Sequence, residues 1–390
     1  MATAAGWKTA GLAIAVAVVG CSCGEGVALD AGADGAMEER DAAPPQFCPD
    51  DLVRHVAFNA ADGVEWGPLA MSLGAHDIAL MGESGGGLRV HAIHRESGRF
   101  EELSDRFPEL ASVDAVSIDP GMLYFMKSEY FLQSETGIYR LHASDMSGTV
   151  ELGLDRAEVS SRQLAPLSGR ELLALDIAEA PPTLEHWTWE LGAAPARREV
   201  AALPGIVRSY GVRATRDGRG QAFLAVYDHG ASEIVVFVLD EEVTRVVREH
   251  RFFAEDVAAL VPDEAGVALV LETGRGVEVH RVSAEDASLW VRLPERYALQ
   301  SVPGSPTDRS FFLLLTEGGL RGDVVMNLAR VRLDRPELEG GFRPVLSSGS
   351  CRGTIAAPAS GGAVVVSSCL DPGSLEYTYF CVPDVSREEL

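Results

Sequence analysis

Short apolar runs recur along this chain at a nearly constant interval, and the interval restricts what the chain can fold into. Successive runs begin roughly 43 to 52 residues apart, which is typical of a structural unit repeated several times. Each run is rich in residues that favour β-strands. The runs are residues 78–81, 122–125, 172–175, 222–226, 267–271, 311–315 and 363–366.

Every run has similar neighbours. A turn and an alternating segment follow it (87–93, 137–143, 233–239, 276–282), then a more polar segment (196–203, 242–250, 288–293). Continuous apolar runs indicate strands covered on both faces, whereas alternation indicates half-exposed strands. We therefore predict an all-β chain, with residues 48–384 forming a single seven-bladed β-propeller of four-stranded antiparallel blades. A pair of multi-sheet β-sandwiches is the alternative.

The last repeat lacks a fourth strand before the chain ends. Its third strand is predicted at residues 376–382, and only a tail, residues 385–390, lies beyond the propeller. Residues 52–58 form an additional strand candidate ahead of the first repeat. Because an open sheet edge promotes aggregation, we expect this N-terminal strand to complete the last blade.

The N-terminus carries a processing signal. An apolar segment, residues 12–19, is too short to span a membrane and ends at Val18-Val19-Gly20-Cys21. This sequence resembles the lipobox of bacterial lipoproteins. The resemblance implies that residues 1–20 are a signal peptide and that the Cys21 thiol is lipidated with acyl chains such as palmitate. It also implies export to the bacterial cell envelope, where Ser22 favours the outer membrane.

Residues 21–47 are rich in Ala, Gly, Asp and Glu and have no apolar periodicity, so we interpret them as a disordered acidic tether. The repeats carry none of the recurring motifs of named propeller families. The resemblance is therefore to propeller-bearing bacterial lipoproteins in general, and it implies no catalytic residues.

The balance of acidic and basic residues restricts the kind of partner that the chain could bind. The chain has 33 basic and 58 acidic residues, a formal net charge of −25. Nucleic-acid binding needs a basic face and is disfavoured. A partner attracted by charge would be a cation or a basic surface.

The remaining cysteines suggest disulfides, which an exported chain permits. Cys351 and Cys369 are equidistant from a turn near residue 360, so we predict that they pair across a hairpin. Closure of the last blade would bring Cys48 beside Cys381, and we predict that bridge too. Cys48–Cys351 is the competing pairing. Cys23 is left without a partner.

An acidic residue follows the central run of every repeat, where one turn of each blade would emerge on a common face. We consider the hypothesis that these carboxylates ring that face and attract a divalent cation such as calcium, or a basic partner. The alternative is that turns of an acid-rich protein are simply polar. The residues are Glu83, Glu129, Asp176, Asp228, Glu272, Glu317 and Asp371.

Catalytic motifs are weak. Residues 82–86 match G-x-S-x-G around Ser84, but a strand follows where a nucleophile elbow needs a helix. The histidines have no zinc-site spacing. Trp187 and Trp189 share a strand face, which favours packing between blades over an exposed platform for a ligand.

No catalytic residue, metal ligand or cofactor is predicted. The leading interpretation is a lipid-anchored envelope protein whose propeller is a binding scaffold for an envelope protein, a peptide or a polysaccharide. The alternatives are a propeller hydrolase or lactonase with a divalent metal in the central channel, and a structural part of an envelope assembly machine.

Overall fold

The structure is a computed structural model. Contacts divide the chain into two units, Met1–Ala43 and Pro44–Leu390, and every described residue belongs to the second. The described residues are 54–59, 65–73, 77–84, 87–93, 100–102, 123–126, 129–134, 137–142, 147–154, 161–178, 180–254, 256–301, 310–318, 324–336, 338–347, 352–356, 363–368 and 374–380.

The regular elements of the described residues are β-strands, and they form four-stranded antiparallel sheets whose strands mostly follow chain order. The first three such sheets are β2 (Glu65–Leu73), β3 (Asp77–Ser84), β4 (Gly87–Ile93) and β5 (Phe100–Glu102); β6 (Leu123–Met126), β7 (Glu129–Ser134), β8 (Gly137–His142) and β9 (Ser147–Gly153); and β10 (Arg162–Ser168), β11 (Glu171–Asp176), β12 (Thr183–Thr188) and β13 (Ala196–Ala202).

Three further sheets have the same order. They are β14 (Ser209–Arg216), β15 (Ala222–Asp228), β16 (Glu233–Leu239) and β17 (Val246–Phe253); β18 (Asp256–Asp263), β19 (Gly266–Thr273), β20 (Gly276–Val282) and β21 (Ala287–Arg292); and β22 (Tyr297–Ser301), β23 (Ser310–Gly318), β24 (Val324–Arg332) and β25 (Leu338–Ser347).

One sheet combines strands from distant parts of the sequence. It contains β26 (Arg352–Ala356), β27 (Ala363–Ser368) and β28 (Ser374–Phe380), and its fourth strand is β1 (Arg54–Asn59). β1 runs antiparallel to β28, with Arg54 opposite Tyr379.

Burial falls from the second to the fourth strand of each well-described sheet. In β15 and β19 nearly every residue is buried, whereas most of β13 is exposed. This gradient explains the sequence pattern, because a strand covered on both faces must be apolar throughout and an outer strand need not be.

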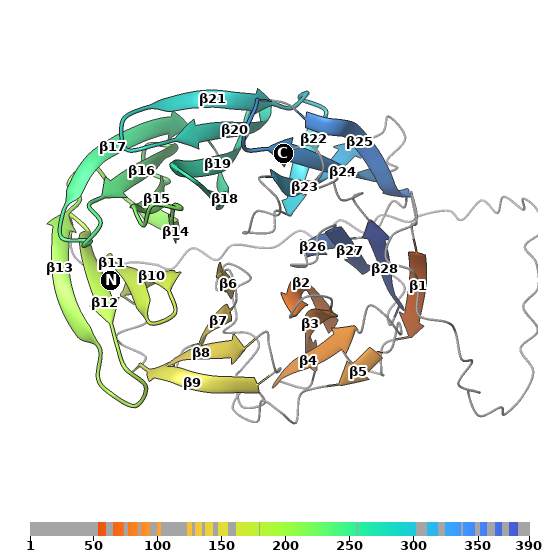
Figure 1. Ribbon diagram of the computed structural model, residues 1–390, viewed down its shortest axis with the longest axis horizontal. Helices are drawn as coiled ribbons and strands as arrows, with labels where there is room; N and C mark the ends of the chain where they lie inside the picture. The colour runs from red at the N-terminus through yellow and green to blue at the C-terminus, as the bar shows by residue number, and fades with distance from the viewer. Residues whose placement is uncertain are drawn as a thin grey trace, which may run out of the picture. The chain divides into compact units, whose positions relative to one another are not determined.

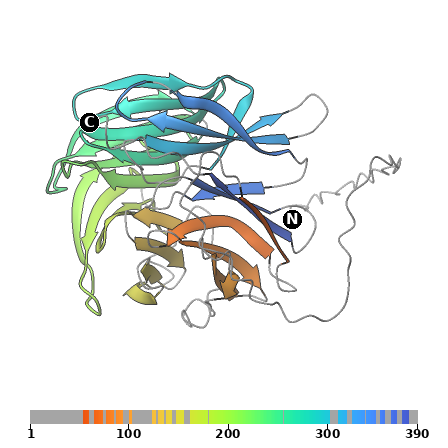
Figure 2. The ribbon, with the colours of Figure 1, turned by 45° about the vertical axis from the view of Figure 1, so that its right-hand side comes forward.

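The hydrophobic core lies between neighbouring sheets. One cluster joins Leu173 and Leu175 of β11 to Leu224 of β15 and Phe237 of β16. Two more clusters join the β14–β17 sheet to the β18–β21 sheet, and that sheet to the β22–β25 sheet. In Figure 2 the green to cyan sheets accordingly face one another. Each of these sheets therefore depends on its neighbours for burial.

The first strands of successive sheets approach one another. β10 contacts β6 and β14, β14 contacts β18, and β26 contacts both β22 and β2. In Figure 1 these strands face a common interior, while β13, β17 and β21 lie outside. Four-stranded antiparallel sheets in this arrangement are built like the blades of a β-propeller.

Most strands lie where the sequence predicts them, and β4, β16 and β20 match to the residue. Two predictions are wrong. The apolar run expected to be the central strand lies in the first strand of its sheet, β6, and the second strand is β7, because Met126 at the end of β6 pairs with Glu129 at the start of β7. The outer strand expected from residue 242 begins at Val246, because residues 240–244 form a turn.

Among the described residues there is no helix with the length and apolarity required to cross a membrane.

Candidate functional site

Five of the acidic residues proposed as a ring lie at the expected place, in the last two residues of a second strand. They are Glu83, Asp176, Asp228, Glu272 and Glu317. Glu129 is an exception: it is the first residue of β7, opposite Met126, and so lies at the other end of its strand. Its assignment to the ring is therefore wrong. Asp371 lies outside the described residues.

Three members of this set have structural roles. Asp228 is completely buried and accepts hydrogen bonds from the backbone N–H groups of Val207, Arg208 and Gly230, at 2.9 to 3.0 Å. Asp176 pairs with Arg162 at 2.8 Å, and Glu317 pairs with Arg296 at 3.1 Å. The Asp228 carboxylate therefore holds two connecting segments together and is shielded from any ligand.

The residues of the lipidation and disulfide predictions, Cys21, Cys48, Cys351, Cys369 and Cys381, lie outside the described residues, as does Cys23. The neighbouring pair Arg352 and Ser368 is in the register from which the Cys351–Cys369 bridge was predicted. All of these assignments stay predictions.

The structure decides how two of the smaller sequence motifs are to be interpreted, the G-x-S-x-G match and the tryptophan pair. Ser84 ends β3 and pairs with Gly87 of β4, so a strand follows it and not the helix that a nucleophile elbow requires. Trp187 and Trp189 are both buried, in a cluster with Ile138 and Leu164. They pack between sheets, as expected.

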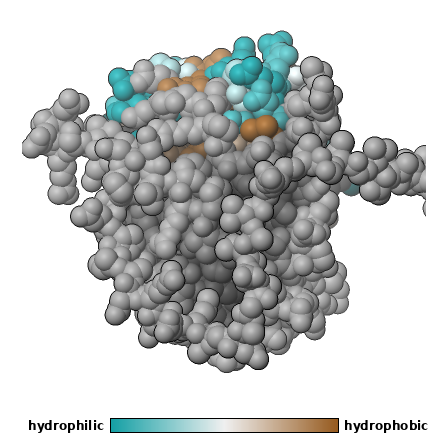
Figure 3. Space-filling view, turned by 90° about the vertical axis from the view of Figure 1, so that its right-hand side faces the viewer, coloured by the Kyte–Doolittle hydropathy of each residue, from teal (hydrophilic) through white to brown (hydrophobic). Residues whose placement is uncertain are grey.

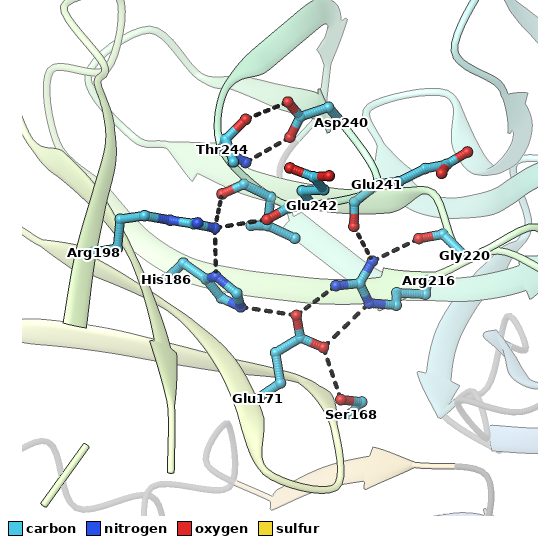
Figure 4. Close-up of polar contacts among 11 residues, drawn as sticks. Ser168, Glu171, His186, Arg198, Arg216, Gly220, Asp240, Glu241, Glu242 and Thr244 are labelled. Atoms are coloured by element: carbon cyan, nitrogen blue, oxygen red, sulfur yellow. Dashed lines mark hydrogen bonds and ion pairs between the residues drawn. The ribbon is translucent and has the colours of Figure 1, made fainter. Parts of the chain in front are cut away.

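A polar cluster that the sequence did not suggest joins the β10–β13 sheet to the β14–β17 sheet (Figure 4). It is centred on Glu171, the first residue of β11. Nε2 of His186 on β12 lies 2.8 Å from Glu171 Oε1, and Arg216, at the end of β14, binds both carboxylate oxygens. Arg198 on β13 completes the group. We call Glu171, His186, Arg198 and Arg216 the Glu171 cluster.

The charge state of Glu171 follows from its neighbours. Burial alone raises the pKa of Glu171, but hydrogen bonds from His186, Arg216 and Ser168, with the positive charge of Arg216, lower it to about 2. Glu171 is therefore a carboxylate at neutral pH.

The tautomer of His186 follows as well. Arg198 Nη2 lies 3.1 Å from Nδ1 of His186, and a guanidinium can only donate. Nδ1 must therefore accept, and the ring proton lies on Nε2, facing Glu171.

Both arginines of the cluster also bind backbone carbonyl groups of the β14–β17 sheet. Arg198 donates to the carbonyl oxygens of Glu242, at 2.6 Å, and Val243, at 3.1 Å. Arg216 donates to those of Gly220, at 2.6 Å, and Glu241, at 3.1 Å. The β16–β17 turn is thereby fixed through its backbone, while the side chains of Glu241 and Glu242 stay exposed.

Exposed carboxylates gather on the connections between first and second strands and between third and fourth strands. These connections share one edge of neighbouring sheets, because Gly218 donates to the carbonyl of Asp263 across the gap at 2.8 Å. We call this edge the acidic edge. Its exposed acidic residues are Glu190, Glu241, Glu242, Glu264, Glu285, Asp286 and Asp334, beside Arg219, Arg245 and Arg335.

The other edge of the same sheets, which we call the opposite edge, carries the buried Asp228 and two of the most exposed apolar side chains. Val207 is 74% exposed and Phe253 is 80% exposed. A third exposed apolar residue, Ile177, follows β11. On the side drawn in Figure 3, the described surface likewise mixes hydrophilic areas with smaller hydrophobic ones.

A second histidine–carboxylate pair occurs two sheets further along. His280 Nε2 lies 2.8 Å from Glu278 on the same strand, and Arg292 of β21 donates to that carboxylate at 2.9 Å. Unlike the Glu171 cluster, this group lies within a single sheet.

Among the residues that the structure describes, no group of three or more His, Cys, Asp or Glu side chains is arranged to hold a metal ion.

No protein-family model and no curated protein matches the chain. Many solved structures have a similar fold. The WD40 domain of Pan2 from Neurospora crassa has 7% identity and a TM-score of 0.48, over 82% of this chain and 90% of that one. The β-propeller domain of the Trilobed protease from Pyrococcus furiosus has 12% identity and a TM-score of 0.43, over 82% and 94%.

Proposed function

We propose that this chain is an exported, lipid-anchored scaffold of the bacterial envelope that binds a basic partner, such as a Lys- or Arg-rich protein surface or peptide. The acidic edge carries the contact. In this proposal Cys21 bears the lipid, and the described sheets are the blades of one seven-bladed propeller. β1 closes the ring by completing the blade of β26–β28.

The observation that carries the proposal is the contrast between exposed and internal carboxylates. Glu241, Glu242 and Glu264 are exposed on neighbouring turns, and Arg198 and Arg216 bind backbone carbonyl groups of the first of these turns. Their negative charge therefore faces solvent on a turn that is already fixed. Preorganised charge of one sign favours association with a complementary surface.

The binding experiment compares two triple charge reversals with the same net charge. One changes Glu241, Glu242 and Glu264 to Lys on the acidic edge. The control changes the exposed residues Glu199, Glu249 and Glu295 to Lys elsewhere. We expect the acidic-edge variant to lose about tenfold more affinity for a Lys-rich peptide at physiological salt. Equal losses in the two variants would show that only net charge matters.

The anchor is tested separately. Cys21→Ser should move the chain from the membrane fraction to the soluble fraction and abolish incorporation of labelled palmitate, since stable anchoring needs more than one acyl chain on the cysteine. Retention of the label in the variant would rule out Cys21 as the attachment point.

A further inference from the structure

The β16–β17 turn is strained and depends on contacts from the adjacent sheet. Val243 has φ +56°, a left-handed conformation that is unfavourable for a β-branched residue. Its side chain is completely buried. Within the turn, Val243 N–H donates to the Asp240 carbonyl, and Thr244 N–H donates to the Asp240 carboxylate. Arg198 of the adjacent sheet binds the carbonyl oxygens of Glu242 and Val243, and Arg216 of β14 binds that of Glu241.

The position of Arg198 depends in turn on His186. The guanidinium Nη2 donates to His186 Nδ1 as well as to the turn. This contact exists only while Nδ1 has a free lone pair. Once Nδ1 is protonated, two N–H groups face each other at a separation of 3.1 Å, and both side chains are cations.

Charged groups from three strands surround His186. The charged groups that face His186 are Glu171 from β11 and Arg198 from β13, and Arg216 from β14 lies across Glu171. The turn presents backbone carbonyl groups, and Asp240 is bound to Thr244 and Arg245. The cluster contains two guanidinium groups and one carboxylate, so a protonated His186 adds a third cation. The gain at Glu171 is limited, because Arg216 already neutralises that carboxylate.

We propose that His186 makes the β16–β17 turn responsive to pH. Neutral His186 holds Arg198 against the turn, and a proton on Nδ1 displaces Arg198 and releases the turn from the neighbouring sheet. The turn is therefore held while Nδ1 carries no proton and is freed when the ring gains one at lower pH. Because the turn carries Glu241 and Glu242, the effect on binding rests on the proposed function, but the release itself needs no partner.

The experiment is amide hydrogen exchange of the purified full chain between pH 8 and pH 5, corrected for intrinsic rates. We expect the exchange of Val243 and Thr244 to rise by about tenfold at low pH, which corresponds to the loss of roughly one hydrogen bond. His186→Gln offers a neutral donor and acceptor at every pH, so its turn should stay protected. The control His229→Gln changes an exposed histidine on the opposite edge and should keep the wild-type response.

A second measurement needs no variant. The ¹⁵N shifts of the His186 ring at pH 8 should report a proton on Nε2 and none on Nδ1. A proton on Nδ1, or a pH response that persists in His186→Gln, would overturn the proposal. So would equal protection of the turn at pH 8 and pH 5. None of these outcomes depends on the acidic edge binding a partner, so this proposal and the proposed function can fail independently.

Discussion

The two edges of the described sheets use the same residue type in opposite ways. On the acidic edge, Glu241 and Glu242 project into solvent, while Arg198 from the neighbouring sheet and Arg216 from the same sheet bind the turn's backbone. On the opposite edge, Asp228 is buried and accepts three backbone N–H groups, while Val207 and Phe253 are exposed. A turn carboxylate is thus buried where backbone N–H groups point toward it and need an acceptor. It is exposed where the turn presents carbonyl groups, which are bound by arginine side chains.

The largest expected effect lies where the two sheets meet. Glu171→Gln should lower the free energy of unfolding at pH 7 by roughly 3 kcal/mol, because the pKa of Glu171 is lowered from 4.5 to about 2 in the folded chain. A lowered pKa stabilises the folded state above pH 4.5, and the contribution disappears as the pH falls toward 2. Urea unfolding of both chains across this pH range measures the difference.

The matched control is Glu242→Gln, which leaves the backbone contact with Arg198 intact and should change stability by less than about 0.5 kcal/mol. Equal losses in the two variants would contradict the central position of Glu171.

The next effect belongs to the opposite edge. Asp228→Ala should cost about 2 kcal/mol, because it leaves buried backbone N–H groups without acceptors. The exposed Asp286→Ala on the acidic edge should be nearly neutral. Thermal unfolding of the pair measures the contrast, and a stable Asp228→Ala chain would mean that water satisfies these groups.

A smaller effect is expected for the exposed apolar side chains. Val207→Ser and Phe253→Ser should change the free energy of unfolding by less than about 0.5 kcal/mol, since both side chains are largely exposed in the folded chain. The double variant should also bind less of a dye specific for apolar surfaces. A loss of stability well above this value would show that the opposite edge is packed against something in the native protein.

The smallest effect concerns repulsion among the exposed carboxylates. Replacing Glu241, Glu242 and Glu264 by Gln should stabilise the chain by a few tenths of a kcal/mol at low salt, and the gain should vanish as salt screens the charges. The same change at Glu199, Glu249 and Glu295 is the control. A larger gain in stability from the control would show that charge repulsion is not concentrated on the acidic edge.

The sequence predicted much of the fold because its pattern is local. β16 and β20 were predicted residue by residue. β20 shows the alternation expected of a half-covered strand, whereas β16 is a continuous apolar run that is buried along nearly its whole length. The assignment failed at β6 and β7, where two apolar runs are separated only by Lys127 and Ser128 and either could be the buried central strand.

The Glu171 cluster could not be predicted in the same way. Glu171 and Arg216 are 45 residues apart, and only the packing of two sheets brings them together. The available signal was weak: His186 is a single titratable residue in β12, whose two faces each mix polar and apolar residues. The sequence predicted a ring of solvent-facing carboxylates from their position in turns. Turn position alone does not show whether a carboxylate faces inward or outward, and Asp228 faces inward.

The sharing of each apolar cluster between two sheets has a consequence for synthesis. Leu173 and Leu175 belong to the same cluster as Leu224 and Phe237, so the β10–β13 sheet has an uncovered apolar face until β15 and β16 have also been made. In this region each sheet buries its apolar face only after the next sheet has been synthesised. A ribosome that stalled between β13 and β14 would therefore leave an uncovered apolar surface that promotes aggregation and proteolysis, and a stall after a later sheet of this region would do the same.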